Sequence, residues 1–137
     1  MRYTCAAIVL VAVLGGVGCR SEGPPPTGRA DKLAPGQYPQ IVPLEGLARA
    51  LRFSQPIVEP SEPGRPMRVS VPTRNLEGRE LNVQYRFTFL DRGGRPLGTN
   101  QGWAYTKLIG NGVETILEAN SLEDTAADWR LELRPAR

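Results

Sequence analysis

The sequence of 137 residues contains no histidine and only two cysteines. Histidine is the commonest general base and metal ligand near neutral pH, so its absence excludes the Ser–His and Cys–His nucleophile pairs of many hydrolases. Cys5 and Cys19 both fall within the first twenty residues, which excludes a disulfide framework or a thiolate zinc site in the rest of the chain. We therefore predict no catalytic residues, no metal and no cofactor, and we expect that the protein is not an enzyme.

The sequence also lacks a large excess of charge of one sign. The chain has 17 Lys+Arg and 14 Asp+Glu, a net charge of +3, and its basic residues are scattered along the sequence. Nucleic-acid-binding proteins concentrate positive charge on one face or stripe, so no nucleic-acid partner is predicted. Hydrophobic residues make up 40% of the sequence, which is enough for an ordinary globular domain.

The one long hydrophobic run lies near the N-terminus, where ten apolar residues (5–14) follow Arg2. Ten helical residues rise about 15 Å, roughly half the thickness of a bilayer's hydrocarbon core. The run therefore indicates a signal peptide and not a transmembrane helix.

Small residues follow the apolar run, and Cys19 comes directly after them. This arrangement resembles the lipobox of bacterial lipoproteins, although Gly16 stands where Leu is usual. The resemblance implies a signal peptide over residues 1–18, cleavage before Cys19, and acyl chains on Cys19 that anchor the protein in a membrane. Arg20, where inner-membrane lipoproteins carry Asp, implies an outer-membrane lipoprotein that faces the periplasm. The alternative is an ordinary secretory signal and a water-soluble product.

Residues 19–40 contain five prolines and few apolar residues. Such a segment cannot bury enough surface to offset the entropy of an ordered chain. We predict a Pro/Gly-rich tether here, followed by one domain over residues 41–137.

The domain follows the period of two that is typical of strands with one buried face. We expect strands at 67–71, ended by Pro72, and at 81–89, 103–109, 113–117 and 129–134, with an edge strand at 57–58. Residues 47–53 predict either a first strand or one or two helical turns, and residues 121–128 a helical turn capped by Ser121. Six or seven short strands predict an all-β fold, an antiparallel immunoglobulin-like β-sandwich.

Three residues are candidates for a binding surface. Trp103 and Tyr105 fall on one face of their predicted strand, which predicts either core positions or an exposed aromatic patch for a partner. Arg86 falls on the polar face of the longest strand, which faces either solvent or a partner. The turn after that strand contains Asp91 and Gly94, for which we expect structural roles, with the Asp91 carboxylate accepting hydrogen bonds from the turn's own amides.

The segment from Leu81 to Arg95 resembles the central motif of the YcfL-type bacterial lipoproteins, a domain family of unknown function. The form V-x-Y-R-F-x-aromatic-x-D-x-x-G is matched by Val83, Tyr85, Arg86, Phe87, Phe89, Asp91 and Gly94. The resemblance covers roughly residues 41–137 and implies a lipid anchor and one β-sandwich without an enzymatic activity. In the founding members a neighbouring gene encodes an activator of peptidoglycan synthases, which by analogy implies a link to the cell wall.

The favoured hypothesis is therefore a non-catalytic outer-membrane lipoprotein whose periplasmic domain binds another envelope component, either a protein or peptidoglycan. One alternative is a wall-glycan hydrolase that uses two facing carboxylates from Asp91, Glu118, Asp124 and Asp128. Another is a carrier of a small apolar ligand, which would need a cavity between the sheets.

Overall fold

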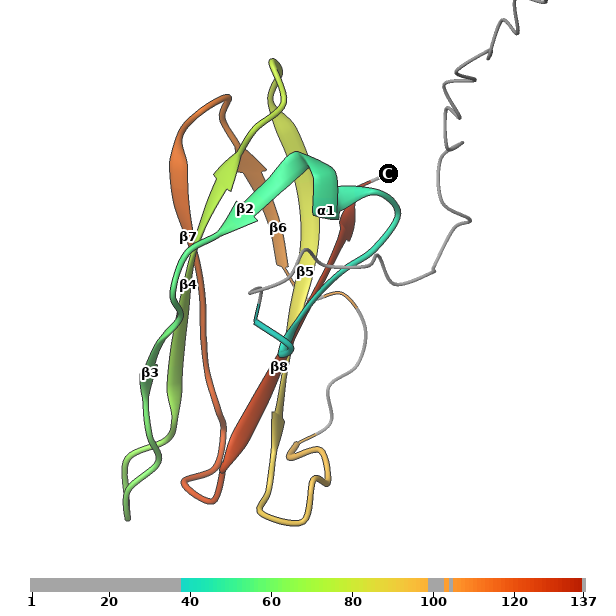
Figure 1. The fold of residues 1–137 in the computed structure, drawn as a ribbon. Coiled ribbons are helices and arrows are strands. Elements are labelled where there is room, and N and C mark those ends of the chain that lie inside the picture. The colour runs from blue at the N-terminus through green and yellow to red at the C-terminus, as the bar shows by residue number, and fades with distance from the viewer. Residues whose placement is uncertain (1–37, 99–102, 104, 137) are drawn as a thin grey trace, which may run out of the picture.

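The computed structural model describes residues 38–98, 103 and 105–136. The predicted signal peptide, Cys19 and most of the predicted tether lie outside the described residues. In the described part of the chain, eight strands and one short helix follow one another (Figure 1). They are β1 (Ile41–Pro43), α1 (Leu47–Ala50), β2 (Leu51–Phe53), β3 (Ile57–Glu59), β4 (Arg68–Asn75), β5 (Leu81–Leu90), β6 (Tyr105–Ile109), β7 (Glu114–Asn120) and β8 (Asp128–Pro135).

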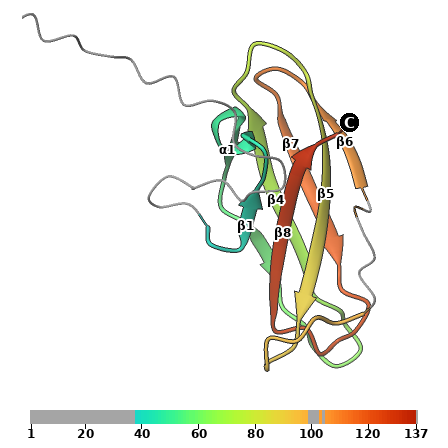
Figure 2. The same ribbon diagram turned by 90° about the vertical axis from the view of Figure 1, so that its right-hand side faces the viewer.

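The strands form two sheets that face each other (Figure 1). In the first sheet the strand order is β1-β8-β5-β6; in the second, β4 lies between β7 on one side and β2 and β3 on the other. Figure 2 looks onto the outer surface of the first sheet, with β4 and β7 behind it. The predicted all-β sandwich is confirmed. Two details differ, because the described residues form eight strands and because β1 runs parallel to β8.

The inner faces of the two sheets meet in one hydrophobic core. Side chains alternate between the faces of a strand, so every second residue is buried along β4, from Val83 to Phe89 in β5 and from Trp129 to Leu133 in β8. The core includes Val69, Val71, Val83, Tyr85, Phe87, Phe89, Leu117, Trp129, Leu131 and Leu133. Each such side chain contributes about 1.5–3 kcal/mol on full burial.

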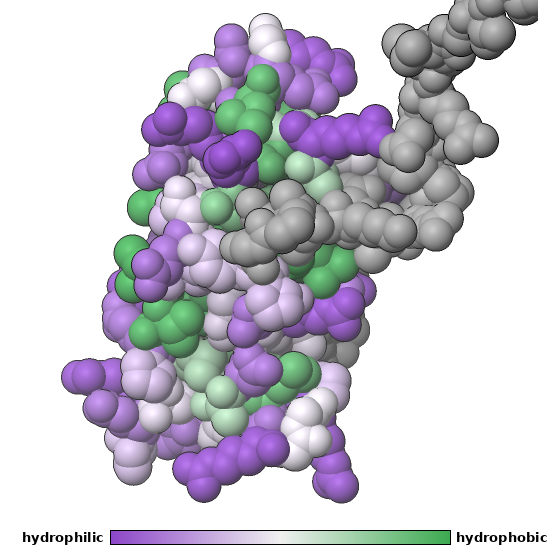
Figure 3. All heavy atoms as spheres, viewed as in Figure 1, coloured by the Kyte–Doolittle hydropathy of each residue, from purple (hydrophilic) through white to green (hydrophobic). Residues whose placement is uncertain are grey.

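The surface near α1, β2 and β3 is largely hydrophilic, and its apolar residues form separate patches (Figure 3). Within the described residues no helix has the length and hydrophobicity that would let it cross a membrane.

The sequence predicts either a strand or a helical turn over residues 47–53, and the structure has both. Residues 47–50 form the single helical turn α1, and β2 continues directly from it. Gly46 precedes the turn with φ of 92°, a left-handed conformation that glycine adopts without steric cost. Leu47 and Ala50 are buried, so the turn lies against the core.

The sequence predicts that Pro72 ends its strand, but this prediction is wrong. Strand β4 runs through Pro72 to Asn75. The carbonyl oxygen of Pro72 accepts a hydrogen bond from Ser54 N–H at 2.9 Å, so its backbone groups point toward β2 and β3. Pro56 and its neighbours separate β2 from β3 at this point. The missing N–H of Pro72 therefore faces Ser54, just past the end of β2, and not β7, so the β4–β7 ladder loses no bond.

Ser121 does not cap a helix, because residues 121–127 form turns and bends. Its hydroxyl oxygen accepts a hydrogen bond from Met67 N–H at 2.9 Å, and the hydroxyl donates to Glu123 O at 2.7 Å. Ser121 N–H also donates to Met67 O at 2.8 Å. The Ser121 hydroxyl, which the sequence predicts to cap a helical turn, instead connects the start of β4 to the end of β7.

Asn75 is a fully buried polar residue at the end of β4. Its Nδ2 donates to Arg79 O at 2.7 Å and to Ile109 O at 3.0 Å, and its Oδ1 accepts from Glu77 N–H at 2.8 Å. Its carbonyl oxygen accepts from Gly112 N–H at 3.1 Å. The side chain of Asn75 thus joins the β4–β5 hairpin to the end of β6, and its backbone carbonyl joins the hairpin to the turn that follows β6.

Candidate functional site

The predicted aromatic pair lies on opposite sides of the first sheet. Tyr105 is paired with Tyr85 on the inner side, with ring centroids 5.1 Å apart and nearly parallel rings, and 47% of Tyr105 is exposed. The Trp103 ring instead lies 5.0 Å from the Arg86 guanidinium carbon and 4.3 Å from that of Arg134. The prediction of one shared face is therefore wrong. The reason is that β6 begins at Tyr105, so strand alternation does not extend back to Trp103.

Trp103 covers part of the outer surface of the first sheet (the surface toward the viewer in Figure 2). The register of β5 with β8 places Arg86 opposite Glu132 and Gln84 opposite Arg134. We call the set formed by these four residues with Trp103 and Arg130 the arginine–tryptophan face.

The polar groups of the arginine–tryptophan face are linked as one set of three residues and one pair. Arg86 Nε donates to Glu132 Oε2, and Arg130 Nε lies 3.8 Å from Glu132 Oε1. Arg134 Nε donates to Gln84 Oε1 at 3.0 Å. Glu132 is thus shared by two arginines, whereas Arg134 is bonded to a neutral amide and has no ion pair with a described carboxylate. The face carries a net positive charge.

One edge of the first sheet is formed by β6 and the other by β1. Asn82 O accepts from Ala136 N–H at 2.8 Å, so the backbone groups of Asn82 point toward β8. Because these groups alternate along a strand, residues 81, 83 and 85 bond β6 and leave Thr106 and Leu108 with N–H and C=O groups directed away from β5. No described strand pairs with this edge. The side chains of residues 105–108 are all exposed, Leu108 by 57%.

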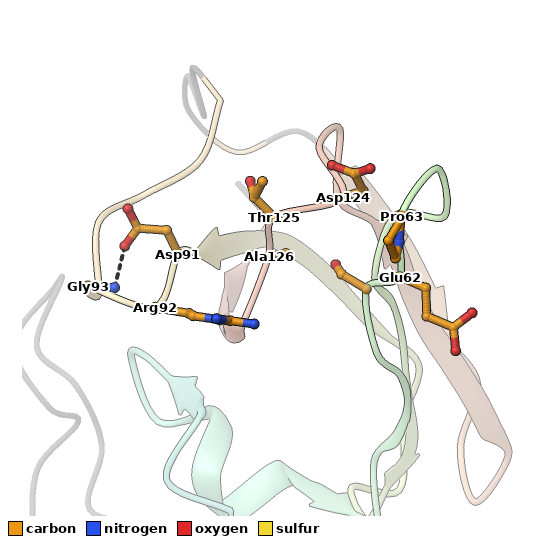
Figure 4. A pocket seen from close by; sticks show the side chains of 9 residues that line it. Glu62, Pro63, Asp91, Arg92, Gly93, Asp124, Thr125 and Ala126 are labelled. Carbon is orange, nitrogen blue, oxygen red and sulfur yellow. Dashed lines mark hydrogen bonds between the residues drawn. The ribbon is translucent and has the colours of Figure 1, made fainter.

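A third candidate is an open cleft among the loops at the end of the sandwich where β5 ends (Figure 4). It is lined by Ser61, Glu62, Pro63, Asp91, Arg92, Gly93, Asp124, Thr125 and Ala126. Two of the carboxylates proposed for hydrolysis, Asp91 and Asp124, are brought to it. In Figure 4 the carboxylates of Asp91, Asp124 and Glu62 point in different directions and not toward one another.

The carboxylates of Asp91 and Asp124 both accept hydrogen bonds from backbone N–H groups. Asp91 Oδ1 accepts from Gly93 N–H at 2.7 Å and from Arg95 N–H at 2.9 Å, and Gly94 has φ of 75° in the same turn. These are the hydrogen bonds and the positive φ expected of turn residues. Asp124 Oδ2 accepts from Gly64 N–H at 2.7 Å.

The other two proposed carboxylates lie elsewhere. Glu118, on β7, forms a salt bridge of 3.0 Å with Arg68, and this bond raises the pKa of the Arg68 guanidinium. Asp128 Oδ1 accepts from Trp129 N–H at 2.8 Å. Among residues 38–98, 103 and 105–136, no group of three or more acidic side chains is arranged to hold a metal ion.

Sequence reasoning found Arg86 and Trp103 but missed Arg134, Gln84 and the β6 edge. The sequence does indicate that Arg134 lies on the outer face of its strand, because it alternates with the apolar Leu131 and Leu133. Its placement beside Arg86 depends on the register between β5 and β8, which are separated by 46 or more positions at each bonded side-chain pair. No local pattern contains that register.

Comparison with known proteins extends the description of the fold. Residues 42–135 match the family described as "Protein of unknown function (DUF1425)". No curated protein matches the sequence. The fold is similar to that of cj0090 from Campylobacter jejuni, with a TM-score of 0.57 and 22% identity over 71% of this chain and 98% of that chain.

A second solved structure, a DUF1425 family member from Shewanella sp. pv-4, has a TM-score of 0.54 and 20% identity over 64% of this chain and 79% of that chain. At these identities the two structures establish a common fold. The family match covers more than half of the sequence, and the chain therefore belongs to the DUF1425 family of proteins of unknown function.

Proposed function

We propose that this protein is a YcfL-type outer-membrane lipoprotein, anchored through Cys19, whose β-sandwich binds another envelope component without catalysing a reaction. The component is an extended segment of a partner protein, and it binds by adding a strand to β6. The observation that carries the proposal is the β6 edge, which pairs with no other described strand and has outward-directed backbone groups at Thr106 and Leu108.

The chemistry of β6 suits such a partner. An extended peptide that pairs with a sheet edge gains main-chain hydrogen bonds, and exposed side chains along the edge select its sequence. Tyr105 and Leu108 supply apolar surface on opposite faces of β6, exposed by 47% and 57%. An added strand would cover part of both.

The charge on β6 favours a partner over a second copy of this chain. Lys107 lies at the centre of the strand between the two outward-directed residues. In an antiparallel pair of β6 strands that bonds Thr106 of each copy to Leu108 of the other, the two Lys107 side chains would lie directly opposite each other and repel. A partner segment with an acidic residue at that position would attract Lys107 instead.

The test uses a photo-crosslinking amino acid in the full chain, expressed in its native cells. We expect a crosslinked adduct of one mass with the probe at Leu108 and no such adduct with the probe at Ile116 of β7. The backbone groups of Ile116 also point outward, since the odd residues of β4 bond β7. Ile116 is therefore a matched position on another edge.

The second arm adds Thr106→Pro to the Leu108 probe. Proline at 106 removes a donor that points away from β5 and leaves the β5–β6 ladder complete. We expect the adduct to disappear, whereas Ile116→Pro should leave it unchanged. Equal adducts at both edges, or an adduct that survives Thr106→Pro, would contradict strand addition at β6.

Anchoring has its own test. Several acyl chains on Cys19 would hold the domain at a membrane through the Pro/Gly-rich tether. We expect radiolabelled palmitate to be incorporated into the wild-type chain and not into Cys19→Ser. Unlabelled wild-type protein in a water-soluble fraction would contradict the anchor and leave the β6 proposal standing.

A further inference from the structure

We infer that the arginine–tryptophan face binds a carboxylate of an acidic polypeptide, held by Arg134 and Arg86 beside the Trp103 ring. This surface lies on the outer face of the first sheet and not at its β6 edge, so the inference goes beyond the proposed function.

The first observation is the close placement of two cations. Arg134 is opposite Gln84, and Arg86 is two positions further along β5, so the two arginines are diagonal neighbours across the β5–β8 pair. Both guanidinium carbons lie within 5.0 Å of the centre of one indole ring. Like charges gathered on one indole ring repel each other, and an anion bound beside them relieves the repulsion.

The second observation is which donors remain. Arg86 and Arg134 each make their described side-chain hydrogen bond through Nε. The terminal nitrogens of each guanidinium form no hydrogen bond with a described residue. These nitrogens form the planar fork that binds both oxygens of a carboxylate.

The third observation is a carboxylate already seated on the same face. Glu132 lies on Arg86, and its side chain is only 16% exposed. Arg134 presents the same kind of donor two residues further along β8, with the neutral Gln84 where Arg86 has an acid. The same cross-strand arrangement thus occurs twice, once with a carboxylate partner at Arg86 and once with a neutral amide partner at Arg134.

Trp103 lies beside the two arginines that would hold the carboxylate. Its ring is partly buried against the two arginines. Contact with the indole face stabilises a guanidinium and restricts its rotation, so the donors are held in place before a ligand arrives. The planar fork binds carboxylate and phosphate alike, whereas the outer surface of a sheet suits an extended polypeptide, which favours an acidic peptide as the source of the anion.

The binding test uses the purified full chain and a fluorescein-labelled hexaglutamate peptide, with fluorescence anisotropy as the readout. We expect Arg134→Gln to weaken binding at least tenfold. Arg74→Gln removes the same charge from the outer face of the second sheet and should change binding less than twofold. Trp103→Leu should weaken binding several-fold. Equal effects of Arg134→Gln and Arg74→Gln would overturn the inference.

Two further probes separate the chemistry. A hexaglutamine peptide of the same length should not bind; equal binding would overturn the inference. Glycerol 3-phosphate, a soluble anionic lipid headgroup, should compete only weakly. If glycerol 3-phosphate binds at Arg134 and hexaglutamate does not, the face binds phosphate and the acidic-peptide inference is wrong.

The conservative variant guards against misfolding. Arg134→Lys keeps the charge but loses the fork, so we expect several-fold weaker binding with an unchanged thermal unfolding midpoint. Wild-type affinity in Arg134→Lys would overturn the assignment of a bidentate arginine. Because Thr106→Pro acts on another surface, it should leave hexaglutamate binding unchanged, which keeps this result distinct from the test of the β6 edge.

Discussion

At the scale of single residues, the described polar groups that matter most are those that join distant parts of the chain. Asn75 and Ser121 are both buried and both bonded to other segments. A buried polar group is costly unless it is paired, and paired groups of this kind specify one arrangement of the segments that they join.

Asn75→Ala should lower the free energy of unfolding by about 2–4 kcal/mol, because it leaves two carbonyl oxygens and one N–H without their partner. The measurement is urea denaturation followed by circular dichroism. Asn82→Ala, at an exposed position on β5, is the matched control and should change stability by less than about 0.5 kcal/mol. Equal losses in the two variants would contradict the role of Asn75.

Tyr85 makes stability depend on alkaline pH. Burial, and then the nearby Tyr105 and Glu118, raise the pKa of the Tyr85 phenol above its ordinary value. The unfolded chain therefore releases this proton at lower pH than the folded chain, and the stabilisation that is complete below about pH 10 is lost as the pH rises further. We expect the unfolding free energy of the wild type to fall relative to that of Tyr85→Phe as the pH rises from about 9 to about 11, measured in steps of about one pH unit. A constant difference would contradict this linkage.

At the scale of elements, backbone direction decides where proline is tolerated. Pro72 lies inside β4 because its nitrogen faces the gap between β2 and β3. Proline in sequence is a sound reason to end a strand, yet the outcome depends on what lies beside the strand. The sequence shows where the proline is, but only the strand pairing shows what lies beside it in space.

The same rule gives a prediction for β6. Thr106→Pro should cost less than about 1 kcal/mol, whereas Lys107→Pro should cost about 3 kcal/mol or more, because Lys107 pairs with Val83 and its N–H points into the ladder. Thermal unfolding of the two single variants measures the difference. Similar losses would mean that the assumed direction of the β6 backbone is wrong.

At the scale of the whole molecule, one core connects the two sheets. Trp129 belongs to that core and contacts Phe87 with ring centroids 6.1 Å apart, whereas Trp103 lies on the outer face. We expect unfolding followed by tryptophan fluorescence and by far-ultraviolet circular dichroism to give coincident single transitions. Separate transitions would indicate that the sheets unfold independently.

The sequence alone determined the all-β fold and the buried face of the long strands, because alternation of side chains is a local property of an extended chain. It also determined the turn at Asp91, whose hydrogen bonds span only four positions. Only the tertiary structure decided which strands are neighbours, which strands lie at the sheet edges and which side chains meet at Trp103. Those contacts depend on register between segments far apart in sequence, and the many side chains of the core select that register together.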